Sequence, residues 1–260
     1  MQVADIASCL EDWAPPHMAE SYDNVGLLVG DPEMKIQGVL INLDMTLPVL
    51  EEARIKGLNM VIAHHPIWFS KRNRLVKGDY VSNAILYAAK YDIALYAIHT
   101  NLDNLRTGVN KKIADQLGLT NLSILKPLPA NPEHGIGMVG ELSESLEKEA
   151  FLQLVKGRFK SGGIRYADGE VRQIKKVAVC GGSGSFLTKE ALAAQVDAFV
   201  TSDITYHKFF DNEQKMLLLD IGHYESEQYT SLLINDYLSK FFPNFAIHLS
   251  EIYTNPVRYF

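Results

Sequence analysis

The segment IQGVLINLDMTLPVLEEARIKGLNMVIAHH (residues 36–65) decides the fold, because two apolar runs in it flank an amphipathic stretch. We predict a strand over 36–44, a helix over 46–57 and a second strand over 59–65. Neither strand alternates strictly between apolar and polar residues. Such runs are typical of parallel strands that helices cover on both faces. The segment therefore predicts an α/β fold with a largely parallel sheet.

The same succession of strands and helices continues along the chain. We predict further helices over 80–92, 108–118, 146–159, 187–195 and 224–242, and strands over 93–100, 137–142, 174–180, 197–203, 215–220 and 246–253. The strand–helix–strand order around VLINLD and MVIAHHP returns around VAVCGG and AFVTSD, which predicts two related α/β lobes.

The segment 125–137 is the best candidate for a boundary between these lobes, because it holds three prolines and two glycines. We therefore place an N-terminal lobe at 1–128 and a C-terminal lobe at 129–260. The terminal segment of the second lobe is free to pack back on the first.

Composition limits the classes of protein to consider. The chain has 260 residues, 47% hydrophobic and 22% charged, which indicates a soluble globular protein. Its net charge of −6 and the lack of any run of like charges argue against broad binding of nucleic acid. Cys9 and Cys180 are too few for a disulfide framework or a thiolate zinc site. With neither a signal-like start nor an apolar run of the ~20 residues that a membrane span needs, we expect a cytoplasmic protein with no membrane partner.

Polar residues follow the predicted strands at the edge where α/β proteins place functional side chains. These residues are Asp44, His64, His65, His99, Asp103, Ser202, Asp203 and His223, and Glu225 and Glu227 come shortly after the last of them. Imidazole nitrogen and carboxylate oxygen are ligands for zinc, iron and manganese. The set therefore points to a metal site.

Spacing selects among the acidic candidates. His223 and Glu227 are four residues apart at the start of a predicted helix, so they share one face and can bind one centre, whereas Glu225 points elsewhere. His99 and Asp103 are also four apart, but the strand has ended there and the geometry stays open.

The adjacent histidines require a bend in the chain. His64 and His65 would face opposite ways in a regular strand. Pro66 excludes the helical region for His65, and the end of a strand permits a bend, so both rings can converge on one cavity.

Each of these residues also has a structural explanation. A single histidine at a strand end is most often a hydrogen-bonded structural residue, and an aspartate in TNLD most often caps a helix. Their combination at one sheet edge favours the metal site. Three histidines and two carboxylates suit two metals that share a bridging carboxylate, and such ions supply a metal-bound hydroxide near neutral pH for hydrolysis.

The glycine-rich stretch VCGGSGSFLTKE (residues 179–190) has two interpretations. Gly181, Gly182 and Gly184 precede a predicted helix and can cradle a phosphate on backbone N–H groups. The stretch is not GxGxxG and lacks the lysine of a P-loop, so a tight strand-to-helix turn is the favoured interpretation. Ser183 and Ser185 have no evident His/Asp partner to make either one a nucleophile.

Four blocks of the sequence resemble those of a known family. ESYDNVGLLVG, IAHHPIWF, HTNLDN and DIGHYESE, in this order, are similar to the signature blocks of the Nif-three-like family. Its bacterial members are often labelled GTP cyclohydrolase I type 2 homologues or dinuclear metal-binding proteins. The resemblance implies two α/β lobes with a dimetal site in the cleft between them. It also implies a toroidal homohexamer, a trimer of dimers.

Carried over block by block, the resemblance implies two divalent metal ions, which would be zinc, manganese, iron or nickel. The implied ligands are His64, His65, Asp103, His223 and Glu227, with Glu227 as the bridge. His99 would orient a ligand or a bound water, and Asp23 and Asn24 would form a structural turn near the cavity.

The chain departs from the family pattern in two places. Larger relatives have an inserted domain in mid-chain, where this chain has only the short stretch PLPANPEHGIG (residues 127–137). Many relatives read Gly-Asp before a Tyr/His pattern, where this chain has Ser202-Asp203 before Tyr206 and His207. The roles of Asp203 and His207 therefore stay open.

Two functions are carried forward. The first is a metal-dependent hydrolase acting on a nucleotide or phosphoester, with opening of the guanine ring of GTP as the reaction that the resemblance implies. His99 or His207 would then transfer protons. The second is a non-enzymatic metal-binding regulator or interaction protein. A ring that threads DNA is the least favoured, given the net charge of −6.

Overall fold

The computed structural model describes residues 1–260, which divide into two compact units. The first unit consists of residues 1–102 and 230–254, and the second of residues 103–229 and 255–260. Each unit contains one β-sheet, so the mixed α/β class predicted from the sequence is confirmed.

The first unit is built on a five-stranded sheet of order β1-β4-β3-β2-β11. β2, β3, β4 and β11 run parallel, and only β1, at one edge, is antiparallel to its neighbour. The strands are β1 (Gly26–Val29), β2 (Val39–Asn42), β3 (Met60–Ala63), β4 (Ala94–Ala97) and β11 (Ile247–Leu249).

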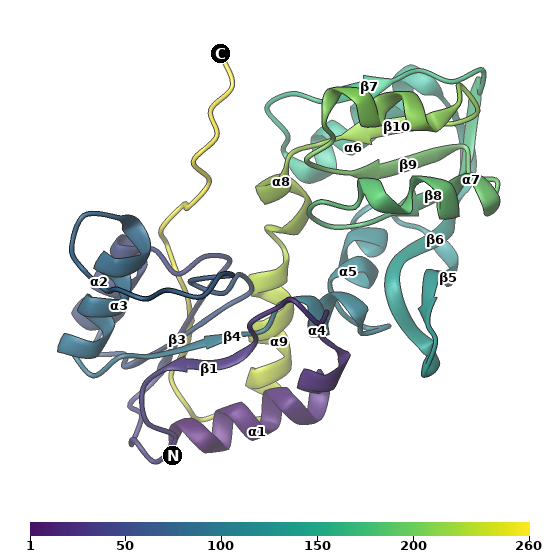
Figure 1. Ribbon diagram of the computed structural model, residues 1–260. Coiled ribbons are helices and arrows are strands. Elements are labelled where there is room, and N and C mark those ends of the chain that lie inside the picture. The colour runs from purple at the N-terminus through teal and green to yellow at the C-terminus, as the bar shows by residue number, and fades with distance from the viewer. The chain divides into compact units, whose positions relative to one another are not determined.

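Helices cover both faces of this sheet, as Figure 1 shows. The helices of the unit are α1 (Val3–Trp13), α2 (Leu47–Ile55), α3 (Tyr80–Lys90) and α9 (Thr230–Phe241), with a short 3₁₀ helix η1 (Pro16–Met18). α2 and α3 contact each other and the sheet, whereas α9 contacts α1, β2 and β11. The one helix of the central βαβ unit, α2, therefore lies within the residues 46–57 for which the sequence predicts it.

The continuous apolar runs have a direct structural cause. Val61 and Ala63 of β3 pack against the residues of α2 and α3, while Met60 and Ile62 alternate with them and are equally buried. Successive side chains of a strand point to opposite faces, so a sheet covered on both sides requires an apolar residue at every position.

The second unit contains a six-stranded sheet of order β5-β6-β8-β9-β10-β7. β8, β9 and β10 are parallel, and the other neighbours pair antiparallel. The strands are β5 (Thr120–Leu128), β6 (Asn131–Glu147), β7 (Arg165–Ala167), β8 (Gln173–Val179), β9 (Ala198–Thr201) and β10 (Leu217–Asp220).

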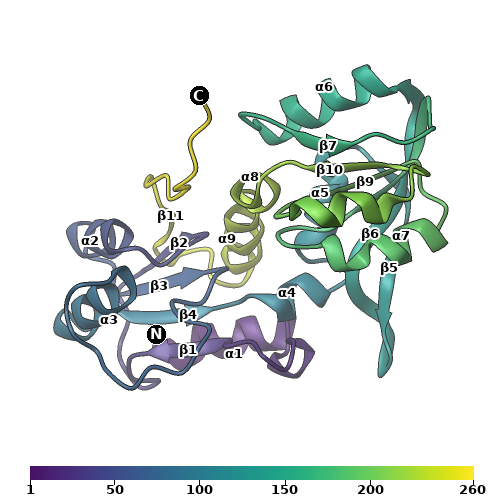
Figure 2. The same cartoon turned by 45° about the horizontal axis from the view of Figure 1, so that its top comes forward.

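Figure 2 shows α6 and α7 on opposite sides of this sheet. The helices are α5 (Val109–Gln116), α6 (Lys148–Phe159), α7 (Thr188–Ala193) and α8 (His223–Glu227), with 3₁₀ helices η2 (Ser185–Leu187) and η3 (Tyr206–Asn212); α4 (Thr100–Asn104) lies where the chain passes between the units. Phe199 and Leu218 pack in one core with Leu187 and Ala191. No helix of the protein is both long enough and apolar enough to span a membrane.

The structure differs from the predicted lobe boundary at 128/129. The proline-rich segment 125–137 lies inside a long antiparallel hairpin of β5 and β6, both in the second unit. The chain instead passes from one unit to the other after residues 102, 229 and 254. Pro127 is compatible with a strand because β5 is an edge strand, where a missing N–H costs no ladder hydrogen bond.

The predicted helix over 224–242 is also divided. α8 ends at Glu227, two turn residues follow, and α9 begins at Thr230. α8 belongs to the second unit and α9 to the first, so the interruption coincides with a passage between the units. The pattern HxxxE is nevertheless on one helical turn, as its spacing predicts.

Candidate metal centre

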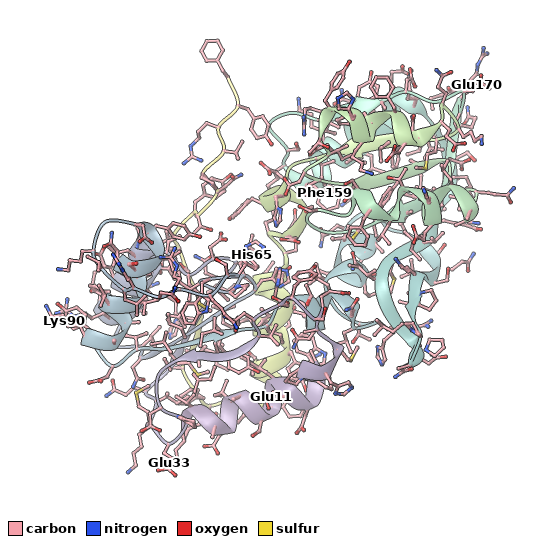
Figure 3. The ribbon with its side chains drawn as sticks, viewed as in Figure 1. Glu11, Glu33, His65, Lys90, Phe159 and Glu170 are labelled. Atoms are coloured by element: carbon pink, nitrogen blue, oxygen red, sulfur yellow. The ribbon has the colours of Figure 1, made fainter.

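Three histidines gather beyond the ends of β3 and β4 in the first unit. His64 and His65 follow β3, and His99 follows β4; Figure 3 labels His65 there. One nitrogen of each ring lies within 4.8 Å of those of the other two. The ring centroids are 5.1 Å apart for His64 and His65, 5.0 Å for His64 and His99, and 5.6 Å for His65 and His99. The bend before Pro66 therefore brings both adjacent rings together.

Each of these histidines has its Nδ1 atom fixed by an acceptor. The Nδ1 of His64 lies 2.9 Å from the carbonyl oxygen of Ile98. That of His65 lies 2.7 Å from Oδ1 of Asp44, and that of His99 lies 2.9 Å from Asp23. Carbonyl and carboxylate oxygens only accept, so Nδ1 carries the proton and the lone pair that can coordinate a metal is on Nε2.

Asp23 has a larger role than the structural turn that the family resemblance implies. Its carboxylate accepts hydrogen bonds from the ring of His99, from the backbone and hydroxyl of Thr100 and from the backbone of Asn24. Burial by itself would raise the pKa of Asp23, but these bonds and the charge of His99 lower it well below its ordinary value. Asp23 thus stays ionised and holds the ring of His99. Asn24 holds the backbone of Trp68.

The second unit presents a histidine–carboxylate pair on α8. The Nε2 of His223 lies 3.1 Å from Oε2 of Glu227, one helical turn away, and its Nδ1 lies 2.7 Å from Oδ2 of Asp203. Burial lowers the pKa of His223, but the charge of Glu227 and the hydrogen bond to Asp203 outweigh it and raise the pKa to about 11. In the absence of metal the ring is therefore an imidazolium between two carboxylates.

Asp103 lies close to Glu227 in the same unit. One carboxylate oxygen of each lies within 4.8 Å of the other. Both acidic side chains act on the buried thiol of Cys180: burial raises its pKa well above the ordinary value, and the charges of Asp103 and Glu227 raise it further. Cys180 is therefore a neutral thiol beneath the acidic groups.

The other candidates of the second unit have defined places. Glu225 points away from the pair, as predicted, and accepts a hydrogen bond from the Nδ2 atom of Asn255 at 3.0 Å. Asp203 adopts a left-handed backbone conformation with φ 54° and accepts from the hydroxyl of Ser183 at 2.6 Å. His207 is exposed on η3 with its ring 5.2 Å from that of Tyr206, and it is not among the side chains whose possible ligand atoms lie within 4.8 Å of those of His223 and Glu227.

Asp220 ties the Asp203 loop to the start of α8. Its carboxylate accepts from the backbone of Ile204 at 2.9 Å and from the backbone of Gly222 at 3.1 Å. Arg165 donates to the same carboxylate and to the carbonyl of Ile204. The residue before His223 and the residue after Asp203 are thus fixed by one side chain.

The glycine-rich stretch is a packed turn. The backbone N–H groups of Gly181, Gly182 and Gly184 are bound by Asn110, Ser226 and Thr201, respectively. These donors are therefore engaged within the protein, which argues against a phosphate cradle. A Cβ atom at Gly182 would lie 2.5 Å from Oε1 of Glu227, so glycine is what lets the turn pack on this carboxylate.

The donor atoms found in each unit are of the kinds that bind divalent transition metals. Imidazole nitrogen with carboxylate oxygen suits zinc, manganese, iron and nickel, and metal-bound histidines characteristically donate their second nitrogen to a carboxylate or carbonyl. His64, His65, His99 and His223 all make such a bond through Nδ1. These side chains could therefore bind a metal ion.

Known proteins are similar to this chain over nearly its whole length. The family model described as Duf34/NIF3 (NGG1p interacting factor 3) matches residues 1–256. The chain belongs to the DUF34/NIF3 family. Among curated relatives, a protein of Clostridium acetobutylicum called GTP cyclohydrolase 1 type 2 homolog is 37% identical over 229 residues, which cover 87% of this chain and 85% of the relative.

The DUF34/NIF3 fold extends over the whole chain. A solved structure of a hypothetical protein from Staphylococcus aureus superposes with a TM-score of 0.93 at 30% identity, covering 100% of this chain and 99% of the other. A relative from Staphylococcus epidermidis, also called GTP cyclohydrolase 1 type 2 homolog, is 28% identical over 366 aligned positions covering both chains fully. That alignment is longer than this 260-residue chain, so the relative carries inserted residues.

Sequence reasoning missed the groups that hold the histidines of this DUF34/NIF3 protein. The sequence places Asp44 among the possible metal-site residues at a strand end but not as the partner of His65, to which it bonds while it accepts from the hydroxyl of Thr254. Ser183 was considered only as a nucleophile, yet it holds Asp203. The one local signal for Asp44 was its place after a strand next to the strand of His65.

A substitution at Gly182 tests the packing of the turn on Glu227. We expect Gly182→Ala to weaken metal binding about tenfold, because the added methyl group displaces the carboxylate. The φ of +59° adds strain of about 1 kcal/mol. Competition with a metal-binding dye measures the affinity, and chemical denaturation measures stability.

Gly157→Ala is the matched control. It adds the same methyl group to α6, where a Cβ meets nothing within 4 Å. It should leave metal affinity unchanged and raise stability by about 0.5–1 kcal/mol through helix propensity. Wild-type metal affinity in Gly182→Ala would contradict the proposed packing.

Proposed function

We propose that this protein is a metal-dependent hydrolase with two divalent ions. The ligands that we assign are His64, His65, Asp103, His223 and Glu227, with Glu227 as the shared ligand. The observation that carries the proposal is the Nδ1 bond made by every one of the three ligand histidines. A histidine kept only for packing has no need of this common orientation, whereas a ligand does.

The chain's own groups have separable tasks. Bound divalent ions would supply the polarisation and the acidified water that hydrolysis needs. Asp44 and Asp203 orient His65 and His223, and Asp23 orients His99. His99, which we leave out of the ligand set, has one ring nitrogen within 4.8 Å of a nitrogen of His64 and of His65. It is the group that we assign to move a proton to or from the substrate.

The names of the curated relatives support a substrate class to test first. The two curated relatives described above are called GTP cyclohydrolase 1 type 2 homolog, so opening of the guanine ring of GTP is the first reaction to test. A non-enzymatic metal-binding regulator is the alternative, and it predicts metal binding without turnover. The homohexamer implied by the sequence resemblance stays a prediction.

The test combines metal analysis with a turnover screen. Purified protein should contain metal and release formate from GTP or hydrolyse a phosphoester, and removal of the metal by a chelator should abolish this activity. His99→Ala should keep the metal and lower turnover about 100-fold, as expected for loss of a proton-transfer group. His248→Ala, an exposed histidine of β11, is the control and should match wild type. Metal-loaded protein that turns over no substrate would contradict the hydrolase and favour the regulator.

A further inference from the structure

An exposed loop follows directly on the paired histidines. Residues 69–80 are exposed at every position and connect the histidine segment to α3. At the start of the loop, the ring of Phe69 lies 5.5 Å from that of His99, and the carbonyl of Trp68 accepts a hydrogen bond from Asn24. The loop therefore emerges at the histidine cluster of the first unit.

The end of the loop is fastened as well. Asp79 caps α3 by accepting from the backbone of Ser82 at 3.0 Å, and Arg72 donates to the same carboxylate at 3.0 Å. Arg72 also reaches the hydroxyl of Ser82 at 3.3 Å. Arg72 therefore joins the first part of the loop to its last part through the ion pair with Asp79.

The loop carries three further positive charges, although the protein as a whole is acidic. The side chains that carry them, Lys71, Arg74 and Lys77, are exposed and form no ion pair. No aspartate or glutamate occurs between Glu52 and Asp79, although the chain as a whole carries a net charge of −6. Cations without carboxylate partners in an acidic protein create a local positive potential, which attracts anions.

We infer that residues 69–77 are the recognition loop for a phosphorylated ligand with a planar base. This inference rests on the proposed function and names the substrate class of the same site. Arg74, Lys71 and Lys77 supply the donors that phosphate oxygens accept, with the planar guanidinium able to bind two oxygens at once. Phe69, which is 55% exposed, offers a face on which a purine can stack.

The arrangement has a catalytic rationale. A hydrolase gains rate when binding energy from the non-reacting part of a substrate fixes the reacting part. A nucleoside phosphate held by its phosphates on the cations, and by its base on Phe69, is fixed beside His99. Uncharged substrates gain nothing from Lys71 and Arg74, so the loop selects for phosphorylated ones.

The inference has two parts: the cations bind phosphate, and Phe69 stacks on the base. Binding of GTP, inorganic triphosphate and guanosine tests these parts separately. Binding is measured by calorimetry with metal-free and with metal-loaded protein. Lys71→Ala/Arg74→Ala should weaken GTP and triphosphate about tenfold in both forms and leave guanosine unchanged. Phe69→Ala should weaken GTP and guanosine but leave triphosphate unchanged.

The matched control is Arg172→Ala/Lys189→Ala. It removes one arginine and one lysine that are exposed and form no ion pair, so it alters the net charge equally. Equal loss of GTP affinity in both double variants would overturn the inference, and so would tighter binding of a single-stranded oligonucleotide than of GTP. A change of oligomeric state in Lys71→Ala/Arg74→Ala would instead assign the loop to subunit contacts and also overturn it.

The experiments distinguish an error in the loop proposal from an error in the proposed metal centre. Metal content in Lys71→Ala/Arg74→Ala should equal that of wild type, because neither residue is a proposed ligand. Protein that binds metal but not GTP or triphosphate contradicts the loop alone. Protein that binds GTP through the loop but never binds metal contradicts the proposed function.

Discussion

Glu227→Gln is expected to weaken metal binding by about 100-fold or more, because a neutral amide replaces the carboxylate that we propose as the ligand shared by two ions. Glu227 is 3% exposed and its Oε2 lies 3.1 Å from Nε2 of His223, so water cannot readily take the place of the carboxylate. The variant keeps the shape of the side chain, and the fold should persist. Metal content by mass spectrometry and affinity by dye competition measure the effect.

Glu225→Gln is the control for this substitution. Glu225 lies on the same helical turn and is also buried, but it bonds to Asn255, and glutamine keeps the oxygen that accepts this bond. It should bind metal as wild type does. Equal metal content in Glu227→Gln and wild type would remove Glu227 from the ligand set.

Metal uptake is expected to strengthen about tenfold for each unit that the pH rises between 6 and 8. The cause is the imidazolium of His223, whose pKa is raised to about 11 with carboxylates facing both of its nitrogens. A metal must displace the proton on Nε2, and at every pH below that pKa this proton competes. Deprotonation becomes easier as the pH rises, so apparent affinity rises in the same direction.

Calorimetry in two buffers of different ionisation enthalpy measures this competition directly. At least one proton should be released for each protein loaded at pH 7. His223→Ala should bind metal more weakly and with a smaller dependence on pH. An affinity that is constant from pH 6 to 8 would show that no ligand is protonated before binding, and would contradict the imidazolium.

The sequence predicted the local features of the site and the class of the fold. Continuous apolar runs indicated parallel strands, and the structure confirms them in β2, β3 and β4. The spacing of HxxxE predicted that His223 and Glu227 share a helical face, and their 3.1 Å separation confirms it. Such features depend on neighbours within a few residues, which is the range over which sequence patterns are informative.

The partners of the histidines could not be predicted, because they are remote in the chain. Asp23 and His99 are 76 residues apart, and Thr254 and Asp44 are 210 apart. No periodicity connects residues at such separations. Only the packing of β3 and β4 beside the other strands brings them together.

The predicted lobe boundary at 128/129 differs from the structure for another reason. Proline and glycine in residues 125–137 resemble a linker, but here they belong to an edge strand and its turn. Gly135 and Gly137 adopt φ values of 156° and 73°, which other residues rarely adopt. A Cβ at Gly135 would lie 2.2 Å from the carbonyl of Lys126 on the paired strand, so the glycine reflects close strand pairing.

Anomalous diffraction from crystals of the metal-loaded protein tests the central claim most directly. We predict two peaks per subunit, with the Nε2 atoms of His64, His65 and His223 at about 2.0–2.1 Å from a metal and oxygens of Asp103 and Glu227 completing the set. Each Nδ1 should keep its present acceptor. Absence of a peak at these residues, or coordination through Nδ1, would contradict the account.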